Sequence, residues 1–313
     1  MGAPLIAEKQ ERRVKTALDE TRLLILGAEV LFGFHLNSVF QNGFPALSPH
    51  ARVLHAASFV LMAICVALLI TPSLQHRIAD GGAATKRIVT ASAAFAAAGL
   101  VPFALSLGID LYIVVGHRFG ARTGVIMGVG LAALAIAAWF GAELLLRPAK
   151  LPEEAMQEHP ETPIDTRVEH MLTEARVLLP GAQALLGFQL AVMLTEAFGA
   201  LPETSKVVHV GSLCCIALSV ILLMAPAAFH RITFGGQNTE SFHRLGSALV
   251  LAAAAPLGVG IVGALFVAVT KALNEPAIGA AVAFGVAVVL TGLWLAYPLL
   301  LRARDGRNKN NTV

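Results

Sequence analysis

Charged and aromatic residues are scarce in this sequence, where they make up 14% and 6% of the 313 positions. A soluble domain carries about 25% charged residues, because its surface has to be solvated. Hydrophobic residues make up 56%, and the mean hydropathy is +0.72. The net charge is only +3, and no basic, aromatic-rich patch indicates nucleic-acid binding. The composition therefore predicts a membrane protein whose main partner is the lipid bilayer, with no nucleic-acid partner.

Catalytic and metal-binding motifs are missing as well. The sequence has no P-loop, no HExxH zinc motif, no nucleophile elbow and no CxxC pair. The three cysteines, Cys65, Cys214 and Cys215, lie inside apolar runs without the spacing of metal ligands, as small buried side chains do. We expect neither an enzyme nor a metal site.

Eight apolar blocks are long enough to cross a bilayer, which takes about 20 residues of helix. A backbone inside lipid has to satisfy its own hydrogen bonds, and the blocks lack the period of two that strands would show. We therefore predict an all-α integral membrane bundle of eight helices. The blocks are 23–42, 53–72, 88–115, 123–146, 177–196, 207–226, 245–270 and 277–301.

Polar stretches divide the chain and orient it. Of the 23 Lys and Arg residues, 18 lie in the N-terminal segment, the loops 72–88 and 226–245, the central linker and the C-terminal tail, so this side should be cytoplasmic. An even number of spans then leaves both termini in the cytoplasm. The predicted organisation is a cytoplasmic amphipathic segment 1–22, a first four-helix membrane repeat 23–147, a cytoplasmic linker 148–176, a second four-helix membrane repeat 177–302 and a cytoplasmic polar tail 303–313.

The strongest pattern is an internal repeat. Residues 13–82 align on 167–236 without a gap at a shift of 154, with 28 of 70 positions identical. One inserted residue after the Pro102–Pro256 pair makes the shift 155, so that Asp110 aligns with Leu265. Because each copy has four spans, both copies enter the membrane in the same direction and should be related by an axis along the membrane normal.

Two runs of the second copy carry a family resemblance: 174–183 (EARVLLPGAQ) and 225–231 (APAAFHR). They resemble a family of uncharacterised four-helix membrane proteins of bacteria. The first copy departs from the pattern, with Leu26 in place of Pro180 and Glu29 in place of Gln183. The resemblance covers both halves and implies residence in the bacterial inner membrane and the helix number, but no activity.

Polar residues inside predicted spans are functional candidates, because burying them in lipid is costly. Four of them, Glu29, His35, Asn37 and Asp110, stand where the second copy has less polar or uncharged residues. In depth, His35 lies between the other polar residues of the outer half of the membrane and Glu29. Together they could line a water-filled cavity or a proton path. Alternatively, Glu29 is protonated or hydrogen-bonded between helices, and Asp110 reaches the outer head groups. The candidate cavity residues are Glu29, His35, Asn37, His55, Asp110 and His209.

His55 and His209 occupy matching positions, so the two imidazoles could face each other near the axis. That geometry could bind a metal or a haem, or each histidine could form an interhelical hydrogen bond in its own copy.

A second group lies at the inner edge, where the pattern Glu-x-Arg opens one helix and His-Arg closes another. These side chains could pair across the bundle and take up a ligand or proton, or they could cap helices and anchor the protein at the head groups. The residues are Glu20, Arg22, His76, Arg77, Glu174, Arg176, His230 and Arg231.

The leading functional hypothesis is transport or permeation of protons or another small solute at the interface of the two repeats. One alternative is a non-catalytic membrane bundle or assembly factor. Another is a haem-binding electron-transfer protein that uses His55 with His209 and His76 with His230, at levels about 31 Å apart along a helix. That spacing is long for rapid electron transfer, so we expect no resident cofactor. The sequence leaves a homo-oligomer open.

Overall fold

The computed structural model describes residues 21, 24–83, 85–146, 163–234 and 237–311, and in these ranges the protein is all-α. Within these described ranges, seven helices are long and apolar enough to cross a membrane. The first predicted block, 23–42, contains the shorter apolar helix Leu24–Ser38, so seven of the eight predicted spans are confirmed as helices of spanning length. The helices are α2 (Pro49–Ile78), α3 (Lys86–Phe119), α4 (Ala121–Leu146), α5 (Ile164–Met193), α7 (Glu203–Ile232), α8 (Glu240–Leu273) and α9 (Pro276–Thr291), which continues through the π-helix η2 (Gly292–Ala296) into α10 (Tyr297–Asn311).

Polar caps and turn residues fix where these helices begin and end. The side chains of Thr85 and Thr239 accept hydrogen bonds from the first turns of α3 and α8, as N-caps do. Gly120 and Asn274 follow the last residues of the same helices with positive φ angles of 94° and 57°, a conformation that ends a helix. The short helices η1 (Phe44–Ala46) and α6 (Glu196–Gly199) lie just before α2 and α7.

The start of α5 differs most from the sequence-based expectation. Helix α5 begins at Ile164, inside the predicted linker 148–176, rather than near 177. Its first turns are too polar for a hydropathy pattern to detect, yet Val168 and Met171 are buried against the rest of the bundle. The helix therefore extends beyond its apolar block, because packing holds its amphipathic start.

The two halves repeat the same helix bounds. At a shift of 154, the ends of α2 coincide with those of α7, and the ends of α3 with those of α8. The shift becomes 155 only where α4 and α9 begin, so the extra residue lies in the preceding loop rather than after Pro102 and Pro256. An insertion inside a helix would rotate every following side chain by about 100°, whereas a loop absorbs it. The counterpart of Asp110 is therefore Ala264, not Leu265.

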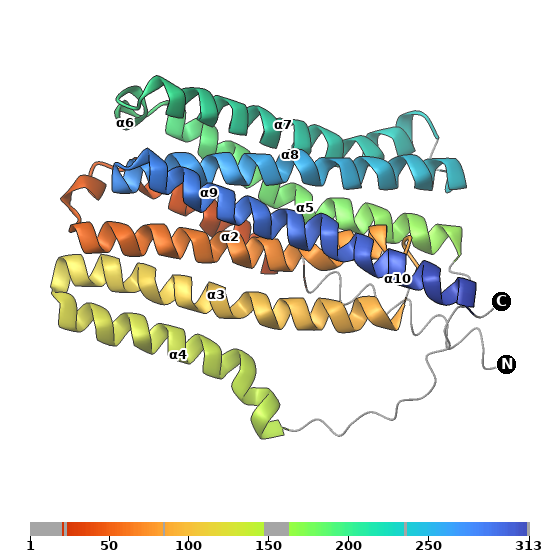
Figure 1. Cartoon of the computed structure of the whole chain (residues 1–313), viewed down its shortest axis with the longest axis horizontal. Coiled ribbons are helices and arrows are strands. Elements are labelled where there is room, and N and C mark those ends of the chain that lie inside the picture. The colour runs from red at the N-terminus through yellow and green to blue at the C-terminus, as the bar shows by residue number, and fades with distance from the viewer. Residues whose placement is uncertain (1–20, 22–23, 84, 147–162, 235–236, 312–313) are drawn as a thin grey trace.

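The helices run nearly side by side, and the loops gather at two ends (Figure 1). The ends of α2 and α7, the starts of α3, α5 and α8, and the whole of α10 share one end. We call it the basic end, because it carries Arg77, Arg87, Arg167, Arg176, Arg231, Arg244, Arg302, Arg304 and Arg307. The opposite end holds η1 and α6.

The halves differ in their neighbours. Helix α8 packs against α7, α9, α5 and α2, whereas α4 packs mainly on α3 at the edge of the molecule (Figure 1). The indole Nε1 of Trp294 in η2 donates a 2.9 Å hydrogen bond to the carbonyl of Ala67 in α2. Its counterpart Trp139 in α4 is 38% exposed and contacts Phe103 of its own half. The halves thus share internal geometry but not surroundings.

Candidate functional site

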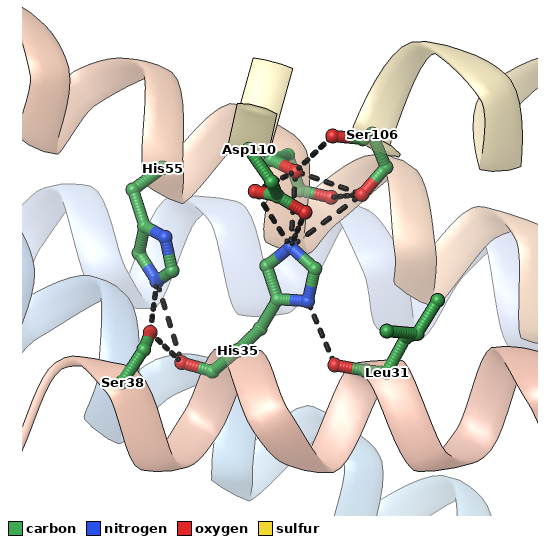
Figure 2. Close-up of polar contacts among 7 residues, drawn as sticks. Leu31, His35, Ser38, His55, Ser106 and Asp110 are labelled. Carbon is green, nitrogen blue, oxygen red and sulfur yellow. Dashed lines mark hydrogen bonds and ion pairs between the residues drawn. The ribbon is translucent and has the colours of Figure 1, made fainter. Parts of the chain in front are cut away.

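His35 is the centre of a buried polar network near the opposite end (Figure 2). The helix Leu24–Ser38 presents its imidazole toward α2 and α3. The Nε2 atom lies 3.0 Å from the Ser58 hydroxyl and 3.2 and 3.0 Å from the two carboxylate oxygens of Asp110. The Nδ1 atom lies 2.8 Å from the carbonyl oxygen of Leu31. Both ring nitrogens therefore lie within hydrogen-bond distance of oxygen atoms, and the tautomer of the ring decides which nitrogen donates.

Serine hydroxyls tie His35 and Asp110 to α2 and α3. Ser58 donates to Asp110 Oδ1 at 2.9 Å, and its hydroxyl lies 2.7 Å from that of Ser106. The His35 side chain is 4% exposed, whereas that of Asp110 is 30% exposed. Of these two side chains, Asp110 is thus the one that solvent or head groups reach.

His55 joins the same network from the first turns of α2. Its Nε2 lies 3.0 Å from the Ser38 hydroxyl and 3.3 Å from the carbonyl oxygen of His35, and its ring stacks on the imidazole ring of His35. Three of the six predicted cavity residues, His35, His55 and Asp110, therefore come together. Asn37 does not join them, because its side chain accepts a 3.2 Å hydrogen bond from Gln41 near the surface.

The second half repeats this frame without the charges. His209 Nε2 donates to the Gln189 carbonyl at 3.0 Å, as His55 approaches that of His35. Gln189 donates to Ser212 at 3.0 Å, and Ser212 donates to the Gly260 carbonyl at 2.6 Å. These bonds correspond, at a shift of 154, to those of His35, Ser58 and Ser106.

The facing pair of histidines that the repeat suggested is not formed: His55 and His209 each bond within their own half. In the described ranges, no group of three or more His, Cys, Asp or Glu residues is arranged to hold a metal ion. The haem hypothesis itself stays a prediction.

Glu29 lies apart from the network, on another face of the same helix. It is six residues before His35, which places it about 9 Å along the axis and about 240° around it. Its side chain is fully buried, and neither carboxylate oxygen has a hydrogen-bond partner among the described residues. It packs directly on α5, where a Cβ atom at Gly181 would overlap its carboxyl group. The predicted single cavity therefore divides into a network and a separate carboxyl group between the halves.

The basic end holds a buried ionic cluster that joins the halves. The carboxylate of Glu174 on α5 accepts a 2.6 Å hydrogen bond from His76 Nδ1 and pairs with Arg77 Nε, both at the end of α2. His76 and Glu174 are fully buried, and the other ring nitrogen of His76 lies 3.1 Å from the carbonyl of Ala83.

The remaining residues of the predicted edge group are not brought into this cluster. Arg176 and Arg231 are exposed, and His230 bonds the Asn238 side chain at 3.1 Å. Glu20 and Arg22 lie outside the described residues, as does most of the predicted segment 1–22.

Sequence reasoning missed the residues that complete both groups. Ser106 stands one turn before Asp110 on α3, so a search for polar residues on the same helix face would have found it. At the basic end, Ser247 accepts a hydrogen bond from Arg77, and Arg167 contacts His243. These three residues, Ser247, His243 and Arg167, carry no such signal, because they lie in the polar first turns of α8 and α5.

Comparison with known proteins gives a family and no activity. Residues 6–143 and 157–298 each match the model of DUF6328, a family of unknown function. No curated protein and no solved structure matches the chain. The two matched segments correspond to the two halves that share helix bounds and hydrogen bonds. With seven apolar helices of spanning length, the chain is a multi-pass membrane protein, and it belongs to the DUF6328 family of unknown function.

Proposed function

We propose that this protein moves protons, or a small solute with them, across the bacterial inner membrane. In this proposal the helix Leu24–Ser38 is also a span, which makes eight spans in two parallel four-helix repeats. The basic end faces the cytoplasm, because Lys and Arg residues favour that side. The ionisable groups of the first repeat, followed by Glu174 of α5, carry the protons.

Glu29 is the observation that carries the proposal. Burying a carboxyl group without a partner costs free energy that an apolar side chain would not. Its side chain is fully buried, and it stands between the halves opposite Gly181. Ionisable residues in such positions within membrane bundles are typical of proton relays.

Ionisable groups stand at three depths along the bundle. Asp110 and His35 lie near the opposite end, and Glu29 lies about 9 Å further along its helix. Glu174 is seven residues from Gly181 on α5, about 10 Å beyond the level of Glu29. A proton taken up by Asp110 passes to Nε2 of His35 and leaves from Nδ1, which points toward the preceding turn. Each remaining gap is several times a hydrogen-bond length of about 3 Å, so water has to enter to bridge it.

Proton flux into liposomes tests the proposal. Purified protein is reconstituted with an internal pH dye, and a potassium gradient with valinomycin drives protons inward. We expect wild-type flux well above that of protein-free liposomes and a loss of at least tenfold in Glu29→Gln. The matched control is Glu203→Gln, which removes a carboxylate that is 84% exposed at the opposite end. The proposal would be overturned if the wild-type protein gave no more flux than protein-free liposomes, or if Glu29→Gln gave as much flux as the wild type.

A non-catalytic bundle is the second candidate, and the repeated hydrogen bonds favour it. His55 and His209 both approach the main-chain carbonyl of the matching residue, His35 or Gln189, so this contact serves helix packing in each half. If Glu29 served packing alone, Glu29→Leu would lower stability. A proton carrier predicts the reverse, because leucine removes an unpartnered carboxyl group: unchanged or raised stability with no flux.

A further inference from the structure

Two hollows lie where α2 of the first half packs on α8 of the second. The first, at the basic end, has a volume of about 190 Å³ and is lined by Arg77, Gly81, Arg167, His243, Arg244 and Ser247. We call it the basic pocket. Three guanidinium groups, a hydroxyl and an imidazole converge on it, which is a donor set suited to a phosphate group.

The charges around the basic pocket are not fully compensated. Arg77 pairs through Nε with Glu174 and donates through Nη1 to Ser247 at 2.6 Å. The side chain is only 4% exposed, and its Nη2 is buried without a partner among the described residues. A buried guanidinium nitrogen without an acceptor is unfavourable, so an anion in the pocket would satisfy it.

The other two arginines leave further donors available. Arg167 Nη1 bonds Glu240 at 3.1 Å, and its Nη2 lies 3.3 Å from His243 Nδ1. Arg244 is exposed and has no ion pair in the described part of the chain. Three arginines therefore face two carboxylates, those of Glu174 and Glu240, which leaves one positive charge in excess.

The second hollow is an apolar cleft of about 420 Å³ between α2, α8 and α9, within the range of about 300–1,000 Å³ typical of ligand sites. Its walls include Leu74, Ile78, Leu251 and Trp294. Leu251 follows Ser247 by one helical turn, and Arg77 stands next to Ile78. Residues one turn apart share a helix face, so the cleft begins where the basic pocket ends and extends toward the middle of the membrane.

We propose that the two hollows form one site for an anionic phospholipid. The phosphodiester binds the donors of Arg77, Arg244 and Ser247, and an acyl chain lies in the apolar cleft. A free phosphate would use only the basic pocket, and a neutral lipid has no net charge to offset the excess of the arginines. Basic pockets between membrane helices bind anionic head groups in this way. The lipid would bridge α2 of the first half and α8 and α9 of the second.

Native mass spectrometry tests this with dioleoylphosphatidylglycerol, dioleoylphosphatidylcholine and inorganic phosphate, each added to delipidated full-length protein in detergent. Arg244→Gln removes an exposed donor without breaking a buried ion pair, and Ala255→Phe fills the cleft. Their controls are Arg304→Gln, exposed on α10, and Ala252→Phe, exposed on α8 outside the cleft.

We expect phosphatidylglycerol to bind at least tenfold more tightly than phosphatidylcholine. Arg244→Gln should weaken it about fivefold, the effect of one basic residue near an anionic surface, and Ala255→Phe should weaken it further, while both controls bind as wild type. Equal retention of the two lipids, or binding insensitive to both variants, would overturn the site. Phosphate binding that rivals the lipid and ignores Ala255→Phe would overturn the lipid assignment in favour of a soluble anion.

Discussion

In the first half His35 bonds Ser58 and reaches the carboxylate of Asp110, whereas in the second half Gln189 takes the place of His35, bonds Ser212 and has Ala264 in the place of Asp110. The hydrogen-bond frame around both is the same. The second half therefore demonstrates that this frame holds three helices together without any ion pair. The first half adds two ionisable side chains, His35 and Asp110, to the same hydrogen-bond frame.

The two halves also differ at the basic end. His76 and Arg77 of α2 are buried against Glu174, whereas their counterparts His230 and Arg231 at the end of α7 lie at or near the surface. The same dipeptide is thus part of a core in one half and a surface anchor in the other. Comparing the halves position by position gives each variant a natural control.

The largest effect is expected at this ionic cluster. Arg77→Ala leaves the Glu174 carboxylate buried with only His76 beside it, and should lower the free energy of unfolding by about 3–5 kcal/mol. Arg231→Ala should change it by less than about 0.5 kcal/mol, as exposed substitutions do. Thermal unfolding in detergent measures both, and equal losses would remove the distinction between the two helix ends.

The contact between the halves should give the next largest effect. Gly181→Ala places a methyl group against the carboxyl group of Glu29 and should cost about 1–3 kcal/mol, as overpacking does. At Gly27, its counterpart, a Cβ atom meets no described atom within 4 Å, so alanine should be neutral or stabilising by up to about 1 kcal/mol. A denaturation series on the two variants would contradict the close contact at Gly181 if their stabilities matched.

Converting the first half to the second at one position should have a smaller effect. His35→Gln can keep the bond to Ser58 but loses the pairing with Asp110, for an expected loss of about 1–2 kcal/mol. Gln189→Ala, its counterpart, removes a neutral hydrogen bond and should cost about 1 kcal/mol. Proton flux should fall only in the His35 variant; a fall in both would place the pathway elsewhere.

The smallest effect tests the unlike surroundings of the halves. Trp294→Phe removes the hydrogen bond to Ala67 and should cost about 1 kcal/mol. Trp139→Phe, at the exposed edge, should cost less than about 0.5 kcal/mol. Melting temperatures that shift equally for both would argue that α4 and α9 are packed alike.

Hydropathy predicted most of the helices because a bilayer selects for long apolar blocks, and the repeat predicted their matching bounds. Hydropathy could not locate the start of α5, because residues 164–176 are largely polar and are held in the helix by packing. The alignment misplaced the counterpart of Asp110, because weak identity within α3 gave no sign that the insertion falls in the loop.

The sequence predicted at what depth each candidate side chain lies, but not which neighbouring helix it faces. His35, His55 and Asp110 share a level and do come together, whereas Glu29 differs from His35 by about 240° around the helix and faces α5. Nor could an internal repeat reveal that α4 lies at an edge while α9 packs on α2, because equal sequences do not fix equal neighbours.

The most direct test of the account is proton flux through a variant in which three ionisable residues of the first half are replaced by their counterparts in the second. The triple variant Glu29→Gln, His35→Gln and Asp110→Ala keeps the frame that the second half already uses. We predict that it inserts and melts like a folded protein but conducts no more protons than protein-free liposomes. Wild-type flux from this variant would contradict the claim that the ionisable groups of the first half carry the protons.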